Sequence, residues 1–218
     1  MTDIIIIFHC RQALCLYMCY RIRDIAEIRL GVALRSRIEH DPAGQVRVVQ
    51  SKDITKDGRL DAHGVYRVRA PKFKSSHRLR AGDVLLQPRG VRYPAAVVDA
   101  DFERAITAAP LYVIRRWSEA IDPVYLVQFL NNPMTQARLR RRATGTYVPQ
   151  LARAEIEDLE IPLPSLDDQR RLVELASLIR REREVAGRLA ELRSQALWGL
   201  MQRAAEEKTQ GRTNAPGL

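Results

Sequence analysis

Arginine and lysine side chains gather in two parts of the sequence, and their chemistry is that of contacts to a polyanion. A guanidinium group can neutralise a phosphate or donate two hydrogen bonds to the edge of a guanine. The first group lies beside predicted strands: Arg67, Arg69, Lys72, Lys74, Arg78, Arg80, Arg89 and Arg92. The second comprises Arg140, Arg141 and Arg142, followed by Thr146 and Tyr147 in a glycine-containing loop. Each residue alone is typical of a solvated surface charge, so the predicted DNA-binding surface depends on the groups.

The overall charge favours the same partner. The chain has 218 residues, a formal net charge of +10 and an apolar content of 46%, and its isoelectric point is about 10.0. This apolar content is enough for one sizeable core. A folded basic protein most often meets a nucleic acid, and the alternative is a generally basic surface with no particular partner.

Catalytic signatures are missing. A methyltransferase needs a glycine-rich cofactor turn and an Asp/Asn-Pro-Pro-aromatic tetrapeptide, and the chain has neither, nor a Gly-x-x-x-x-Gly-Lys-Ser/Thr phosphate loop. Asp99, Asp101 and Glu103 could hold a magnesium ion, but "VVDADFERA" is more simply a strand end and a turn. The sequence therefore predicts a protein that is not an enzyme, with no catalytic residue and no cofactor of its own.

Metal and redox chemistry are also not expected. The cysteines, Cys10, Cys15 and Cys19, match no metal-binding spacing even with His9, and the rest of the chain has none. Without a disulfide scaffold the chain suits the reducing cytoplasm. It contains no run of 18 apolar residues, so no membrane span is expected. Residues 1–17 fit poorly with the remainder of the chain, and Met18 is a plausible natural start, so we interpret 1–17 as an N-terminal extension, artefactual or loosely attached.

These side chains must be positioned by an α+β domain. Strand-like apolar runs cover residues 46–50, 65–69, 84–87, 95–99 and 111–116, and a short helix leading into a strand covers 22–30. Short amphipathic helices follow at 124–132 and 134–142, and then a helical turn and an extended exit at 154–164. We predict a globular domain with a curved mixed or antiparallel sheet and short helices.

A long helix follows this domain. Ser165 and Asp168 have the spacing of a capping box, and no proline or loop signal interrupts the chain from Leu166 to about Ala205. About forty helical residues would reach roughly 60 Å. An apolar stripe runs along it: Leu172, Leu175, Leu178, Ile179, Val185, Leu189, Leu192, Ala196 and Leu200. Such a stripe predicts a coiled-coil-type partner helix, and the alternative is a helix that folds back over its own domain. The polar residues 206–218 are expected to be disordered.

The ordered set of motifs resembles the specificity (S) subunit of type I restriction–modification systems over residues 20–203. The motifs are "RIRDIAEIRLG" (21–31), "VVQSKDITKDGRL" (48–60), "LRAGDVLLQPRG" (79–90), "PVYLVQFLNNP" (123–133) and "ATGTYVPQLARAEIEDLEIPLPSLDDQRRLVELASLI" (143–179). The resemblance implies a DNA target-recognition domain at 18–164 and a spacer and dimerisation helix at 165–205. It also implies docking to a DNA adenine methyltransferase subunit, which would bind S-adenosylmethionine, and to a translocating restriction subunit that acts in phage defence.

The usual S subunit has two recognition domains and two helices, whereas this sequence has one of each. We therefore expect a half-subunit that pairs with itself through the long helix, since a two-fold interface needs only one self-complementary stripe. Pairing with a different half-subunit and a truncated remnant remain alternatives. So does a standalone DNA-binding or regulatory protein that reuses the domain without a methyltransferase.

Overall fold

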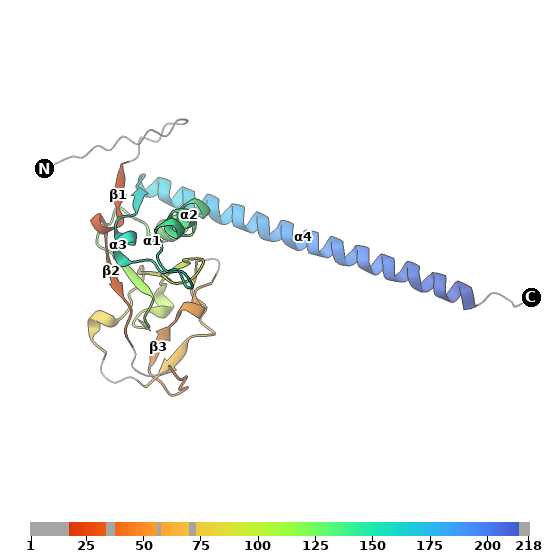
Figure 1. Cartoon of the computed structure of the whole chain (residues 1–218), viewed down its shortest axis with the longest axis horizontal. Helices are drawn as coiled ribbons and strands as arrows, with labels where there is room; N and C mark the ends of the chain where they lie inside the picture. Colours follow the sequence, from red (N-terminus) through yellow and green to blue (C-terminus); the bar gives the residue numbers. More distant parts are fainter. Residues whose placement is uncertain (1–17, 34–37, 56–57, 70–72, 214–218) are drawn as a thin grey trace, which may run out of the picture. The chain divides into compact units, whose positions relative to one another are not determined.

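The computed structural model describes residues 18–33, 38–55, 58–69 and 73–213, with side chains through Arg203 (Figure 1). Residues 1–17, to which the predicted extension, His9, Cys10 and Cys15 belong, lie outside the described residues, as do Lys72 and 214–218. The strands are β1 Cys19–Arg21, β2 Ala26–Leu30, β3 Val46–Val49, β4 Tyr66–Val68, β5 Val84–Leu86, β6 Ala95–Val97, β7 Ile106–Thr107, β8 Tyr112–Arg116 and β9 Glu160–Pro162. The helices are α1 Pro123–Asn131, α2 Pro133–Arg142, α3 Arg153–Glu157 and α4 Leu166–Thr213.

The predicted α+β class, with antiparallel and mixed sheets, short helices and a long C-terminal helix, is confirmed. In place of one curved sheet, the described strands form three small sheets with the orders β2-β8-β5-β6, β4-β3-β7 and β1-β9. All pairings are antiparallel except that of β3 with β7. The stretch 97–105, interpreted only as a strand end and a turn, is followed directly by β7, which was not predicted and pairs in parallel with β3.

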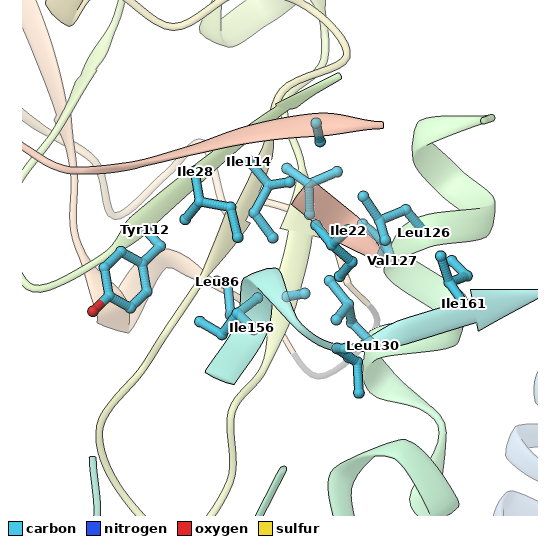
Figure 2. Close-up of a cluster of buried hydrophobic side chains, with 14 of the residues drawn as sticks. Ile22, Ile28, Leu86, Tyr112, Ile114, Leu126, Val127, Leu130, Ile156 and Ile161 are labelled. Atoms are coloured by element: carbon cyan, nitrogen blue, oxygen red, sulfur yellow. The ribbon is translucent and has the colours of Figure 1, made fainter. Parts of the chain in front are cut away.

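The two central strands of the four-stranded sheet, β8 and β5, are buried on both faces. On β5, Val84 and Leu86 belong to one apolar cluster and Leu85 belongs to another, because successive strand residues point to opposite faces. The first cluster lies between this sheet and the short helices, where Leu126 and Leu130 of α1 meet Ile22 and Ile114 (Figure 2). Burial on both sides explains why these strands are continuous apolar runs rather than alternating ones.

The short helices begin where the sequence places their caps. Asp122 accepts hydrogen bonds from the backbone N–H groups of Val124 and Tyr125, and Asn132 accepts one from Met134. Each cap is followed by a proline at the first helical position, where the missing N–H costs nothing. The caps therefore fix α1 and α2 as two separate helices.

The long helix starts at the predicted cap. The Ser165 hydroxyl accepts from the Asp168 N–H at 3.2 Å and donates to the Asp168 carboxylate at 2.8 Å, so the second half of the capping box runs through the hydroxyl rather than the Ser165 N–H. The helix continues to Thr213 rather than ending near Ala205. Residues 206–213 include two glutamates, Lys208 and Gln210, which favour helix, alongside Gly211, which does not, and they are helical up to Thr213 where disorder was expected.

The chain divides into two compact units after Val173. The first unit contains the sheets, the short helices and the first two turns of α4, so it extends a little beyond the predicted domain boundary at 164. The Gln169 side chain is fully buried there. Its amide donates to the carbonyls of Ala120 and Pro164 at 2.8 and 2.9 Å and accepts from the Asp122 N–H at 2.9 Å. Gln169 therefore fixes the start of α4 within the domain.

Candidate nucleic-acid interface

Two members of the first predicted basic group, Arg67 and Arg78, stand at the three-stranded sheet together with two further arginines. We call these four residues the β3 cluster, formed by Arg47, Arg67, Arg78 and Arg104. Arg47 and Arg67 are directly opposite each other in the β3–β4 pairing, and Arg78 bridges to Ile106 of β7. The Arg78 guanidinium donates to the Arg104 carbonyl at 2.8 Å. Four cationic side chains from distant parts of the sequence are thus brought to one edge of the domain.

The second basic group is built by two loops that pair through their backbones. We call it the loop cluster, formed by Arg89, Arg92, Arg140–Arg142, Thr146 and Tyr147. The Gly90 N–H donates to the Pro149 carbonyl at 3.0 Å, and the Leu151 N–H donates to the Pro88 carbonyl at 2.9 Å. The loop that follows β5 therefore lies against the loop that follows α2.

A buried glutamine holds the first of these loops on α2. The Gln136 amide accepts from the Tyr93 N–H at 3.0 Å and donates to the Tyr93 carbonyl at 2.8 Å. Both residues are buried, so these bonds are shielded from water. Arg89 and Arg92 precede this anchor and are exposed. The loop cluster therefore presents exposed cations from a fixed backbone.

Tyr147 stands out in the loop cluster because its side chain is 98% exposed. It follows Gly145, which has φ of +106°, a conformation suited to glycine, and Thr146, which is also exposed. An exposed aromatic ring beside arginines can stack on a base or a sugar. The arrangement suits contact with nucleic acid better than a role in the core.

Two of the predicted cations that the structure describes form ion pairs with carboxylates. Arg69 forms an ion pair with Asp41 at 2.6 Å. Arg142 lies 3.8 Å from the Glu155 carboxylate and donates to the Glu155 carbonyl at 3.0 Å. Arg140, Arg141, Lys74 and Arg80 are exposed; the latter two precede and follow Arg78. The exposed cations that form no ion pair are therefore better placed for a ligand than Arg69 and Arg142.

A buried ion pair supports the β3 cluster. Asp83, at 2% exposure, accepts two hydrogen bonds from Arg115, at 2.7 and 2.6 Å. This bonding raises the pKa of Arg115, whereas burial and the nearby Arg115 charge lower the pKa of Arg29. Arg29 and Arg115 both donate to the Arg78 carbonyl, at 3.2 and 3.0 Å. The pair and its neighbour therefore fix the backbone at Arg78.

Arg47 and Arg104 were missed by sequence reasoning. Arg47 alternates with the buried Val46 and Val48, which signals the outer face of a strand. Arg104 lies in the segment interpreted only as a turn, and its φ of +68° has no signature in a single arginine. The alternation in β3 could have identified Arg47, but the position of Arg104 required the β7 pairing.

The apolar stripe on α4 is exposed along its described length. All nine predicted stripe residues are exposed, with Leu175 at 53%, Val185 at 63% and Leu192 at 51%. Leu197, Trp198 and Met201 are also exposed and were not predicted. Trp198 is nine residues from Leu189, which at about 100° per residue places it on the opposite side of the helix. The exposed apolar surface of α4 is therefore wider at its C-terminal end.

The structure also bears on metal binding and on membrane-spanning helices. Among residues 18–33, 38–55, 58–69 and 73–213, no group of three His, Cys, Asp or Glu side chains is arranged to hold a metal ion. Within the same part of the chain, no helix is long and apolar enough to cross a membrane.

Comparison with solved structures shows what fold this is. A chain from a structure of a type I restriction–modification system matches at 19% identity and a TM-score of 0.66, covering 92% of this chain and 47% of that one. The HsdS subunit from Thermoanaerobacter tengcongensis matches at 19% identity and a TM-score of 0.54, covering 80% of this chain and 40% of that one. The S subunit from M. genitalium matches at 15% identity and a TM-score of 0.52, covering 77% of this chain and 40% of that one. No protein-family model and no curated protein matches the sequence.

The chain therefore has the fold of S subunits of type I restriction–modification systems. It spans less than half the length of these solved chains.

Proposed function

We propose that this chain acts in a DNA-reading specificity subunit of a type I restriction–modification system and contributes one recognition domain and one long helix to it. The observation that carries the proposal is the match of 92% of the chain, domain and long helix together, to a component of such a system. A match confined to the domain would fit many DNA-binding proteins. The combination of a basic domain with a long helix is what favours a specificity subunit.

In this proposal the recognition domain reads one half-site in double-stranded DNA. The exposed side chains of the β3 cluster and the loop cluster divide into phosphate contacts, which give affinity, and base contacts, which give specificity. Tyr147 and Arg89 belong to loops fixed by backbone hydrogen bonds and are therefore suited to enter a groove. Affinity would fall with salt in proportion to the number of phosphates contacted.

The long helix is the proposed site of self-association. The stripe of exposed apolar side chains on α4 is the observation that supports this site. Two stripes of exposed leucines from Leu172 to Leu200 could cover each other in a two-fold pair. An antiparallel pair would hold two identical recognition domains apart, so the DNA site would be bipartite and symmetric.

Catalysis would belong to partners. An adenine methyltransferase subunit would bind S-adenosylmethionine and flip the target adenine out of the duplex. A translocating restriction subunit could join the same assembly. This chain would contribute target recognition and positioning, and no bond-making step.

The test is to purify the tagged chain from its native host and to select bound duplexes from a random library. We expect an adenine methyltransferase to copurify and a bipartite, inverted-repeat sequence to be enriched. Recovery of a symmetric sequence without a methyltransferase would favour the alternative of a standalone DNA-binding regulator. Enrichment of no sequence would contradict a specificity subunit.

A further inference from the structure

We propose that the hollow lined by Arg47, Arg78 and Arg104 is a phosphate cradle that holds one backbone phosphate of the DNA against the recognition domain. The inference rests on the proposed DNA-reading function and assigns one of its contacts. The hollow has a volume of about 610 Å³ and is also lined by Gln45, Val46, Glu103 and Ala105.

Two of the three guanidinium groups, those of Arg47 and Arg78, are oriented before any ligand arrives. Arg47 lies over the Phe102 ring, with its guanidinium carbon 5.4 Å from the ring centroid, and donates to the Asp101 carbonyl. Arg78 donates to the Arg104 carbonyl at 2.8 Å. Each of these bonds uses only part of the donor set of a guanidinium, which has five N–H groups. Donors therefore remain for an anion, and less side-chain entropy is lost when it binds.

The charge around the hollow is not balanced by the chain. Among the described residues, no carboxylate forms an ion pair with Arg47, Arg78 or Arg104. Arg67 adds a further positive charge directly opposite Arg47, and like charges in this position destabilise a strand pair. Glu103 is the acidic residue at the hollow, and it is exposed. A bound anion would offset this repulsion.

The backbone around the hollow is fixed in two ways. Arg29 and Arg115 both donate to the Arg78 carbonyl, and Arg115 is held by Asp83. The Leu79 N–H donates to the Ala105 carbonyl and the Arg104 N–H donates to the Leu79 carbonyl, at 2.8 and 3.1 Å. The Arg78 and Arg104 segments are therefore joined, and Asp83 is a positioning residue for the cradle.

A phosphodiester is the ligand that this chemistry favours. Several guanidinium groups around one concave site suit an oxyanion, whereas a base edge is neutral and needs a matched set of donors and acceptors. A phosphate contact carries no sequence information directly, so the cradle should strengthen binding to all duplexes equally. It would set the register of the domain on DNA while other side chains read the bases.

The decisive variant pair is Arg47→Met with Arg104→Gly. Methionine keeps an unbranched stem over Phe102 without the charge, and glycine accepts the φ of +68° at position 104 more readily than arginine does. Neither change should impair folding, which circular dichroism and a thermal melt would check. The matched control is Arg170→Ala, which removes the charge of an exposed arginine at the start of α4.

The measurement is fluorescence anisotropy with the full chain and two unrelated 30-base-pair duplexes between 50 and 200 mM salt. We expect the double variant to raise Kd roughly five- to tenfold for both duplexes and to reduce the slope of log K against log salt by about one unit. The control should change Kd less than about twofold, because no phosphate contact is removed.

Each other outcome of this experiment would contradict a specific part of the proposal. An unchanged salt slope with intact DNA binding would show that the hollow holds no phosphate. A loss confined to one duplex would replace phosphate contact with base reading, and tighter binding of single-stranded RNA would replace DNA as the ligand. Absence of duplex binding by the unsubstituted chain would overturn the proposed function itself.

Discussion

The first compact unit, here called the domain, and the part of α4 beyond Val173 bury their apolar residues to opposite extents. The domain buries Ile22, Leu85 and Ile114 almost completely, in clusters formed by its own strands and helices. In the described part of α4 beyond Val173, the large apolar side chains are exposed, Leu189 among them at 46%. The domain can therefore be stable alone, whereas the helix needs another surface to cover its stripe. The domain is therefore stabilised by its own core, whereas α4 beyond Val173 depends on another surface to bury its apolar side chains.

The largest expected effect is on the domain. Asp83→Asn removes the charge that holds Arg115 and should lower the free energy of unfolding by about 3–5 kcal/mol, because a buried guanidinium loses its partner. Trp117 lies in the domain and Trp198 in α4, so Trp198→Phe leaves a fluorescent reporter of the domain alone. Urea unfolding in this background is the measurement. Asp167→Asn, at an exposed ion pair, should change little; a similarly small change in Asp83→Asn would contradict the comparison.

The next largest effect is on self-association through α4, and the stability of the domain should not change. Leu189→Glu places a charge in the middle of the stripe and should weaken self-association at least ~100-fold, about 2.7 kcal/mol. Analytical ultracentrifugation over a concentration series measures it. Gln195→Glu carries the same added charge about 120° away around the helix and should associate like the parent. Equal association of the Leu189→Glu variant would exclude the stripe as the interface.

A third prediction concerns the start of α4, which belongs to the domain. Gln169→Ala leaves the Asp122 N–H and the Ala120 and Pro164 carbonyls without this partner and should cost about 2–3 kcal/mol of domain stability. The same tryptophan-reporter urea experiment applies. Arg170→Ala is the adjacent exposed control. If both variants unfold at the same urea concentration, the first turns of α4 do not stabilise the domain.

The smallest prediction is a pH dependence within the domain. Burial raises the pKa of Asp53 above its ordinary value of 3.8, although the Gln50 N–H donates to its carboxylate and opposes the shift. The stability that Asp53 contributes is therefore present below its unfolded pKa and is lost as pH rises through its folded pKa. Asp53→Asn does not titrate, so its stability relative to the parent should rise between about pH 3.5 and 7. If the difference in the free energy of unfolding between Asp53→Asn and the parent stays constant across this pH range, the raised pKa of Asp53 is contradicted.

The sequence predicted the elements whose patterns are local. The cap at Ser165, the apolar runs of β5 and β8 and the stripe on α4 each produce their signal within a few residues. The two-residue strand β7 did not, because two residues carry no period, and its parallel partner β3 lies more than fifty residues earlier in the chain. The division into three sheets followed from that contact and could not be predicted.

The candidate interface was predicted as a composition and not as an arrangement. The sequence identified Arg78 and Arg89 as members of basic groups but could not divide them between the β3 cluster and the loop cluster. It could not show that Asp41 pairs with Arg69, or that Arg47 and Arg104 join Arg78 at one hollow. These relations depend on strand register and on long-range loop contacts.

The pairing of the loops at Gly90 and Pro149 has a consequence for how such a surface can change. The contacts that hold these loops together include backbone hydrogen bonds, which are largely indifferent to side-chain identity. Exposed positions such as Arg89, Arg92 and Tyr147 can therefore be exchanged while those bonds stay in place. Under the proposed function, two lineages could share this scaffold and diverge in the DNA they bind through a few surface substitutions that leave these backbone bonds in place.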